Sequence, residues 1–461
     1  MSQPDEIKIL AHDSFRQSLS RRSFLQVGGA AAGMGLMLIG CGSSKSTTSV
    51  ATTGAPGTTG AAGTTAAGTT TTTGTTAAGT TAAGTAAATT VGAATTTAGT
   101  PVVSAVTSEA AGNVTYSTVV NKATGTLAMY TWGAYNDPTI VGTLAESTLG
   151  VKMKVDYYTS NEELIAKLSA AKGTTGYDIV VPTGPYIPQM IEKGLLMKFD
   201  KSKLPNMTNV DRLYLGQAWD TTNDYSVCKD WGTTGWFYDK TVIKTEIKTW
   251  SDFIAACQGD ASGKCTVLDT AANLCGMYFW ANGIDWNTEK KEDLDACEAF
   301  LVDKFASHIK AFESYPSTKL AEGAYSLSMM WNGDARAAYQ DISDAGGKVD
   351  NWVWGVGSPD TELWMDNYCI AAGSPNADAA HAWINWLLVP EISVKDLAFH
   401  GYNSGMKNIG ALIKQYQPTL PHPEMIFFSD AQVKTMHTQK ITSAQDRLVD
   451  IQNKVKAKAG G

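Results

Sequence analysis

The chain has 461 residues, of which 43% are hydrophobic and 17% are charged, and its formal net charge is −8. This length can supply separate cores for two lobes. The mildly acidic balance disfavours nucleic acid as a partner, but it does not by itself select a ligand.

Residues 1–41 have the pattern of a bacterial export signal. Arg21 and Arg22 supply positive charge ahead of a short apolar stretch of small residues at 27–39. The stretch is too short to span a membrane readily as a helix. The paired arginines indicate twin-arginine export. The four residues that end in Cys41 are similar to a lipobox, in which the cysteine is lipidated. We therefore expect a protein of the periplasm or cell surface that Cys41 anchors to the membrane.

Residues 42–115 consist mainly of Thr, Ala and Gly. No charged residue occurs at 47–108, and no aromatic residue occurs between Phe24 and Tyr116. A segment with so little to bury cannot offset the entropy of ordering its backbone. We predict a disordered tether with a root-mean-square reach of roughly 45 Å, at ~5–6 Å × √n.

Six cysteines follow the predicted tether. They are Cys228, Cys257, Cys265, Cys275, Cys297 and Cys369. An even number in an exported protein allows disulfides, and Cys257 and Cys265 are the easiest pair to close across their short loop. Buried free thiols are the alternative. A zinc site is not expected, because neither a Cys-x-x-Cys motif nor a histidine cluster accompanies them.

The region from residue 116 onward alternates predicted strands and helices. Strands are predicted at 126–132, 151–158, 177–182, 231–238, 326–331 and 363–371. Helices are predicted at 137–149, 160–168, 187–192, 377–388 and 443–458, with Asp137, Ser160 and Asn376 as candidate N-caps. This alternation indicates an α/β fold with a mostly parallel sheet. The strand that begins at Trp231 could carry the chain into a second lobe.

Aromatic and polar side chains recur near the ends of these strands, where ligands of such sheets bind. They are Trp132, Tyr135, Thr183, Tyr186, Trp331, Asp334, Trp364 and Asp366, the last two near the start of their strand. Aromatic faces attract cations, and carboxylates form charge-assisted hydrogen bonds with them. The set therefore suits an organic ammonium ligand. Core packing is the alternative role for each Trp, and turn or cap positions are the alternative for Asp334 and Asp366.

Seven segments together resemble the spermidine/putrescine-binding proteins of ABC transporters. They are Tyr-Thr-Trp-Gly-Ala-Tyr (130–135), Ser-Asn-Glu-Glu (160–163), Tyr-Asp-Ile-Val-Val-Pro (177–182), Lys-Gly-Leu-Leu (193–196), Asp-Lys-Ser-Lys-Leu-Pro-Asn (200–206), Met-Met-Trp-Asn-Gly-Asp (329–334) and Trp-Met-Asp (364–366). The resemblance implies a two-lobed, type II periplasmic-binding-protein ("Venus flytrap") fold with hinge crossovers near Trp231 and Trp364. Lobe 1 would comprise 116–231 and 365–415, and lobe 2 would comprise 232–364 and 416–461.

The resemblance also implies roles for individual residues. Trp132 and Tyr135 would wall an aromatic slot, Trp331 would stack on the methylene chain, and Asp334 and Asp366 would pair with ammonium groups. Thr183, Tyr186, Trp364, Asp269 and Asn273 complete the expected ligand-binding set.

Two positions depart from the family pattern. Asn273 stands where a Glu is common, and Pro185 stands where some members have Tyr. Losing a carboxylate would weaken the recognition of one ammonium group. The ligand could therefore be putrescine-like, another cationic amine, or a weakly cationic solute.

The expected function is capture of a polyamine and its delivery to an ABC permease by a monomeric, lipid-anchored protein without a cofactor. A sensor of the same fold, or a binding protein for another small cationic or neutral solute, is the alternative. An enzyme is not expected, since the chain lacks Gly-x-Ser-x-Gly, His-Glu-x-x-His, Walker A and dinucleotide-binding motifs. A purely structural surface protein would explain the tether, but not the aromatic and acidic residues at strand ends.

Overall fold

The computed structural model of the protein describes residues 114–171 and 176–460. The predicted export signal, Cys41 and all but the last two residues of the predicted tether at 42–115 lie outside the described residues.

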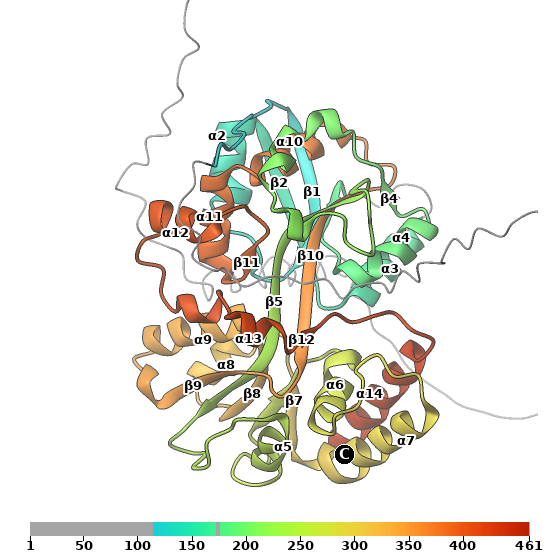
Figure 1. The fold of residues 1–461 in the computed structure, drawn as a ribbon, viewed down its shortest axis with the longest axis vertical. Coiled ribbons are helices and arrows are strands. Elements are labelled where there is room, and N and C mark those ends of the chain that lie inside the picture. Colours follow the sequence, from blue (N-terminus) through green and yellow to red (C-terminus); the bar gives the residue numbers. More distant parts are fainter. Residues whose placement is uncertain (1–113, 172–175, 461) are drawn as a thin grey trace, which may run out of the picture. The chain divides into compact units, whose positions relative to one another are not determined.

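The first lobe is built on three parallel strands, with β1 (Gly125–Trp132) between β2 (Val151–Tyr158) and β3 (Ile179–Val180). Figure 1 shows helices on both sides of this part of the sheet. The helices are α2 (Ala145–Leu149), which a π-helical turn at Ile140–Leu144 precedes, α3 (Asn161–Ala170), α4 (Ile187–Glu192), α10 (Ala377–Leu387), α11 (Pro390–His400) and α12 (Ile409–Tyr416). Two short strands, β4 (Leu196–Met197) and β11 (Asn403–Ser404), pair with the long strands described below.

The second lobe repeats the parallel arrangement, with β6 (Cys265–Val267) between β7 (Ile309–Phe312) and β8 (Leu327–Trp331). β9 (Trp352–Val356) is antiparallel to its partner β5. The helices are α5 (Trp250–Gln258), α6 (Ala271–Ala281), α7 (Lys291–Phe300), α8 (Ser317–Ala321), α9 (Asn332–Asp344) and the C-terminal α14 (Gln445–Ala459). Before α14, the chain forms α13 (Asp430–Val433) and β12 (Met436–His437), which pairs with the start of β10.

Two long antiparallel strands, β5 (Ser226–Asp239) and β10 (Thr361–Ala371), run through both lobes (Figure 1). They join the two parallel units into one sheet of order β2-β1-β3-β10-β5-β8-β6-β7. Every residue of β10 is buried, and so is every residue of β5 but its last. A bulge between Asp366 and Asn367 shifts the register of the pair.

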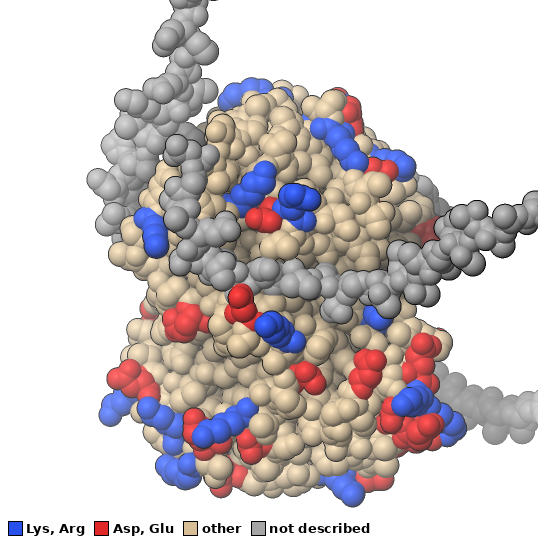
Figure 2. Space-filling view, viewed as in Figure 1, with Lys and Arg blue, Asp and Glu red and all other residues tan. Residues whose placement is uncertain are grey.

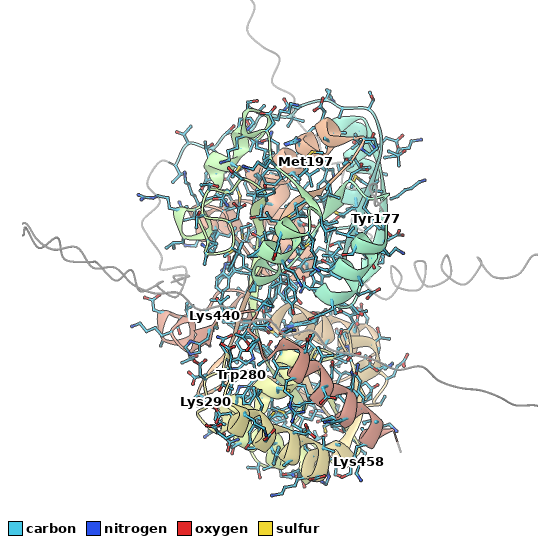
Figure 3. All side chains as sticks on the ribbon, turned by 90° about the vertical axis from the view of Figure 1, so that its right-hand side faces the viewer. Tyr177, Met197, Trp280, Lys290, Lys440 and Lys458 are labelled. Atoms are coloured by element: carbon cyan, nitrogen blue, oxygen red, sulfur yellow. The ribbon has the colours of Figure 1, made fainter. Side chains whose placement is uncertain are left out.

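Each lobe has its own hydrophobic core. The core of the first lobe includes Leu127, Met129 and Trp383, and the core of the second includes Trp250 and Trp280. Trp331 packs against both cores, so the junction between the lobes is partly apolar. In the side view of Figure 3, Tyr177 and Met197 lie in one lobe, Trp280, Lys290 and Lys458 lie in the other, and Lys440 lies near the junction.

The α/β prediction is confirmed, and most predicted elements are found within a few residues of their expected bounds. The strand at 151–158 is found as predicted, but the strand expected at 177–182 is limited to Ile179 and Val180. Trp364 and Asp366 lie inside β10 rather than near its start, because pairing with β5 begins upstream of them.

The three predicted helix caps differ in their contacts. Ser160 caps α3 by accepting a hydrogen bond from the backbone nitrogen of Glu163. Asn376 occupies the N-cap position of α10, but its side chain makes no capping bond and instead donates to Asp178. Asp137 caps the turn that precedes α2, since its carboxylate accepts hydrogen bonds from Thr139.

All six cysteines that follow the predicted tether are buried free thiols in the structure. Two pairs of thiols adjoin each other, Cys257 with Cys265 and Cys275 with Cys297, and burial together with the neighbouring thiol raises the pKa of Cys257 and of Cys297.

The side chain of Asn332 ties β5 to two later segments of the chain. Its Oδ1 accepts a hydrogen bond from the backbone nitrogen of Thr233 (2.9 Å), and its Nδ2 donates to the carbonyl of Met425 (2.8 Å). Asn332 is fully buried. We expect Asn332→Ala to lower the free energy of unfolding by about 1–3 kcal/mol, because buried backbone groups lose their partners. Denaturant unfolding measures this loss.

Asn453→Ala is the matched control, since Asn453 is an exposed residue of α14. We expect this change to alter the free energy of unfolding by less than about 0.5 kcal/mol. Equal effects of the two substitutions would show that the Asn332 contacts contribute little to stability.

Candidate functional site

A cavity of about 290 Å³ lies between the lobes, and all ten residues of the predicted ligand-binding set line it. Trp132 ends β1, and Thr183 follows β3. Trp331 ends β8, whereas Asn273 lies in the first turn of α6. Residues from both lobes and from the long strand β10 thus line one cavity. Which of the ten contact a ligand stays a prediction.

Tyr135 connects two buried carboxylates at one end of the cavity. Its hydroxyl oxygen lies 2.7 Å from Asp366 Oδ2 and 2.5 Å from Asp230 Oδ1. Burial raises the pKa of Tyr135 well above its ordinary value, so the phenol stays protonated. A phenol carries one hydrogen and can donate to only one of the two carboxylates at a time. The second short contact therefore favours a proton on one of the carboxyl groups.

Asp366 is the carboxylate of this pair that lines the cavity. Burial, and next the charge of Asp230, raises the pKa of Asp366 to about 7. The side chain is 4% exposed, and its Oδ1 accepts no hydrogen bond from the described residues. A buried carboxylate in this state would gain from a cationic partner in the cavity.

A buried cluster of charged side chains lies next to Tyr135. Lys229 Nζ lies 2.7 Å from Asp230 Oδ2, 3.5 Å from Asp396 Oδ2 and 3.9 Å from the centre of the Tyr135 ring. His400 Nε2 lies 3.3 Å from Asp230 Oδ2. Sequence reasoning missed this cluster, although the adjacent charged residues Lys229 and Asp230, directly before the strand predicted at 231–238, were a signal for it.

Aromatic rings form the walls of the cavity. The rings of Trp132 and Trp331 are 6.2 Å apart at 69°, and those of Trp364 and Tyr402 are 4.7 Å apart at 80°. Trp132 is held in place because its Nε1 donates to the carbonyl of Val181 (3.1 Å). Such walls offer ring faces and edges both to methylene groups and to cations.

Three of the predicted polar residues already have partners within the protein. Asp334 accepts a hydrogen bond from the hydroxyl of Tyr402. Asp269 lies at the rim, where it forms an ion pair with Lys456 of α14. Thr183 Oγ1 accepts from Asn161 Nδ2 at 2.9 Å. Asp366 accepts from Tyr135 through Oδ2, but its Oδ1 has no donor among the described residues.

Tyr186 also has a partner, because its hydroxyl donates to Glu162 Oε1 at 2.8 Å. Sequence reasoning did not select Glu162, Tyr402 or Tyr315, all of which line the cavity. Tyr315 and Tyr402 are remote from the predicted strand ends along the chain, so only the folded structure places them at the cavity. Glu162 closely follows the strand predicted at 151–158, and its position there was the signal for it.

Glu362 is a further lining residue that sequence reasoning missed. It is 7% exposed, and its Oε2 accepts hydrogen bonds from Thr234 Oγ1 (2.7 Å) and Asn273 Nδ2 (2.6 Å). The signal was present in the period of two along β10, which places Glu362 on the same face as Trp364 and Asp366. It was overlooked because the strand was expected to begin only at Leu363.

Charges of both signs are interspersed over the visible face of the protein (Figure 2). Within the described residues, no helix is long and apolar enough to cross a membrane, and no group of three or more His, Cys, Asp or Glu side chains is arranged to hold a metal ion.

The chain is similar to known bacterial transport proteins. It is 31% identical to the spermidine/putrescine-binding periplasmic protein of Escherichia coli over 283 residues, which cover 60% of this chain and 76% of the relative. It is 27% identical to the putrescine/agmatine-binding protein of Pseudomonas aeruginosa over 288 residues, which cover 60% of this chain and 77% of that protein.

Solved structures share its fold. A putative spermidine/putrescine ABC transporter protein from Listeria monocytogenes matches with a TM-score of 0.63 and 24% identity, covering 73% of this chain and 98% of that one. A lipoprotein of Treponema pallidum matches with a TM-score of 0.62 and 24% identity, covering 72% and 99%. The expected two-lobed, type II periplasmic-binding-protein fold is thereby confirmed. Residues 139–417 match the family described as bacterial extracellular solute-binding protein, and the chain belongs to this family.

Proposed function

We propose that this protein binds a polyamine of the putrescine or spermidine type between its lobes and delivers it to an ABC permease. The observation that carries the proposal is the buried carboxylate of Asp366, which lines an aromatic-walled cavity and has an oxygen without a donor among the described residues. The names of the relatives from Escherichia coli and Pseudomonas aeruginosa support the same class of ligand. The alternative is another small cationic or neutral solute, or a sensor that binds the same ligand without transport.

An ammonium group in this cavity would relieve an unfavourable arrangement of charge. Asp366 and Asp230 are buried side by side, and Lys229 contacts Asp230 directly. A ligand cation beside Asp366 would supply the missing positive charge and favour the ionised carboxylate. The rings of Trp132, Trp331 and Trp364 would cover the hydrocarbon part of an amine. An uncharged sugar would leave Asp366 without a counter-ion.

The proposed mechanism is closure of the two lobes around the ligand. Lobe 1 (116–231 and 365–415) would contribute Asp366, and lobe 2 (232–364 and 416–461) would contribute Trp331. A ligand that contacts both lobes stabilises the closed form, since only contacts that differ between two states shift their populations. We assign the hinges to β5 and β10, the long strands that run through both lobes.

We also propose that the protein is exported by the twin-arginine route, anchored by a lipid at Cys41, and active as a monomer without enzymatic turnover. The arginine pair and the lipobox-like sequence support the first two points. The length of the Thr, Ala and Gly segment would let the binding lobes reach a permease from a fixed anchor.

Calorimetric titration of the purified protein with amines, amino acids, sugars and small anions tests the proposed ligand class. We expect saturable binding of putrescine or spermidine and no binding of neutral sugars. Thermal unfolding gives a second readout, because a ligand of the native state raises the melting temperature. Stabilisation by sugars or anions alone, with no response to amines, would refute the proposal.

The raised pKa of Asp366 predicts a pH-dependent affinity. Because ammonium binding favours the carboxylate, a group with a pKa of about 7 in the empty protein must lose its proton on binding. Affinity should be constant above pH 7 over the range in which the ligand's amines stay protonated, and it should fall by up to about tenfold for each pH unit below pH 7. Near pH 7, calorimetry in buffers of different ionisation enthalpy should detect release of roughly half a proton per ligand.

Asp366→Asn should remove this pH dependence and weaken amine binding by about 2–5 kcal/mol, because the ammonium loses its charged partner. Asp350→Asn, at an exposed position of the second lobe, is the matched control and should retain both the affinity and its pH profile. An unchanged pH profile in Asp366→Asn would assign the titration to another group.

Lipid anchoring has a separate test. Cys41→Ala should remove the acyl acceptor and release the protein from the membrane fraction, whereas Cys369→Ala should leave the protein there, because Cys369 is buried in the first lobe. Fractionation followed by immunoblotting measures the distribution. Retention of the Cys41→Ala protein in membranes would point to an uncleaved signal as the anchor.

A further inference from the structure

Three side chains of one strand line the cavity in a row. Glu362, Trp364 and Asp366 alternate along β10 and all contribute to the cavity wall. Residues two apart on a strand share a face, and each residue advances by ~3.3 Å, so the backbones of Glu362 and Asp366 are roughly 13 Å apart. The row therefore has a carboxylate at each end and an indole between them.

Glu362 resembles Asp366 in being a buried acid without a cation. It is 7% exposed, and none of the described Lys, Arg or His residues forms an ion pair with it. Burial raises the pKa of Glu362, while hydrogen bonds from Thr234, Asn273 and Trp331 lower it. All three donors are neutral, and those of Thr234 and Asn273 both bind Oε2, so the carboxylate keeps the capacity to accept from a ligand.

The side chain of Asn273 is oriented to donate a hydrogen bond to Glu362. Its Oδ1 accepts a hydrogen bond from Thr270 Oγ1 (2.5 Å), which directs its Nδ2 to Glu362 Oε2 (2.6 Å). Thr270 is the N-cap of α6, and Asn273 lies in the first turn of that helix. The amide of Asn273 thus donates a hydrogen bond to the acid Glu362 and does not itself take the place of an acid.

We propose that Glu362 binds a second ammonium group of the ligand, that Asn273 positions its carboxylate, and that the ligand is accordingly a linear amine with at least two charged nitrogens. This inference rests on the proposed function. One ammonium pairs with Asp366, the hydrocarbon chain crosses Trp364, and the other ammonium pairs with Glu362. The departure at Asn273 is thereby compensated, because β10 supplies the acid that the first turn of α6 lacks.

A comparison of a diamine with a monoamine of matched length isolates the role of Glu362. Putrescine and pentylamine differ in that one ammonium group is replaced by a methyl group. We expect the wild-type protein to prefer putrescine by about 100-fold or more, as measured by calorimetry. In Glu362→Gln this preference should fall below about tenfold, while the affinity for pentylamine changes little.

Two further variants complete the test. Asn273→Ala should lower the same preference by a smaller factor, because the carboxylate remains but loses its orientation. A merely structural role of Asn273 would instead weaken both ligands alike. Glu292→Gln is the matched control, because Glu292 is exposed on α7 and should keep the wild-type preference.

The outcomes separate this inference from the proposed function. If the wild-type protein binds no amine, the proposed function fails. If it binds putrescine and Glu362→Gln keeps the full preference, the role of Glu362 is refuted and the proposed function stands. Circular dichroism establishes that each variant is folded; should Glu362→Gln unfold, the preference of Asn273→Ala decides, and an unchanged value overturns the inference.

Discussion

The antiparallel pairing of β5 with β10 places Asp230 directly opposite Asp366 in the register. Side chains that face each other across such a pair lie close together, and two like charges at this position are destabilising. Both residues are buried, so solvent does not screen their repulsion. The same two strands run through both lobes, and β10 supplies Glu362, Trp364 and Asp366 to the cavity wall. The two strands that we propose as hinges therefore also carry an unfavourable pair of buried carboxylates.

The surrounding residues offset the repulsion between Asp230 and Asp366 on one side only. Lys229 forms its shortest contact with Asp230 and a longer one with Asp396, both on the side away from the cavity. Tyr135 bridges the two acids, but its single hydrogen can satisfy one of them at a time. On the cavity side, Asp366 receives no comparable cation from the described residues. Burial, and next the charge of Asp230, therefore raises the pKa of Asp366, and a cationic solute is the group that would complete the arrangement.

The sequence predicted the α/β class, most strands and ten of the residues that line the cavity, because hydrophobic periodicity and a family resemblance constrain these features locally. It did not reveal which acids are already occupied. Asp334 is bound by Tyr402, 68 residues away, and Asp269 is paired with Lys456 of the last helix. Such partners meet only in the folded chain. Glu362 was missed for a different reason, since placing the start of its strand two residues too late removed it from the period-two pattern.

The position of Glu362 also bears on why an asparagine is suitable at residue 273. An acid in the first turn of α6 would lie beside Glu362, and two carboxylates in contact inside a buried cavity repel each other unless one of them is protonated. An amide at the same place donates to the carboxylate and lowers its pKa, which favours the charged form. The neutral Asn273 of α6 and the acidic Glu362 of β10 therefore complement each other. This arrangement places one acidic group at this end of the cavity, as Asp366 does at the other.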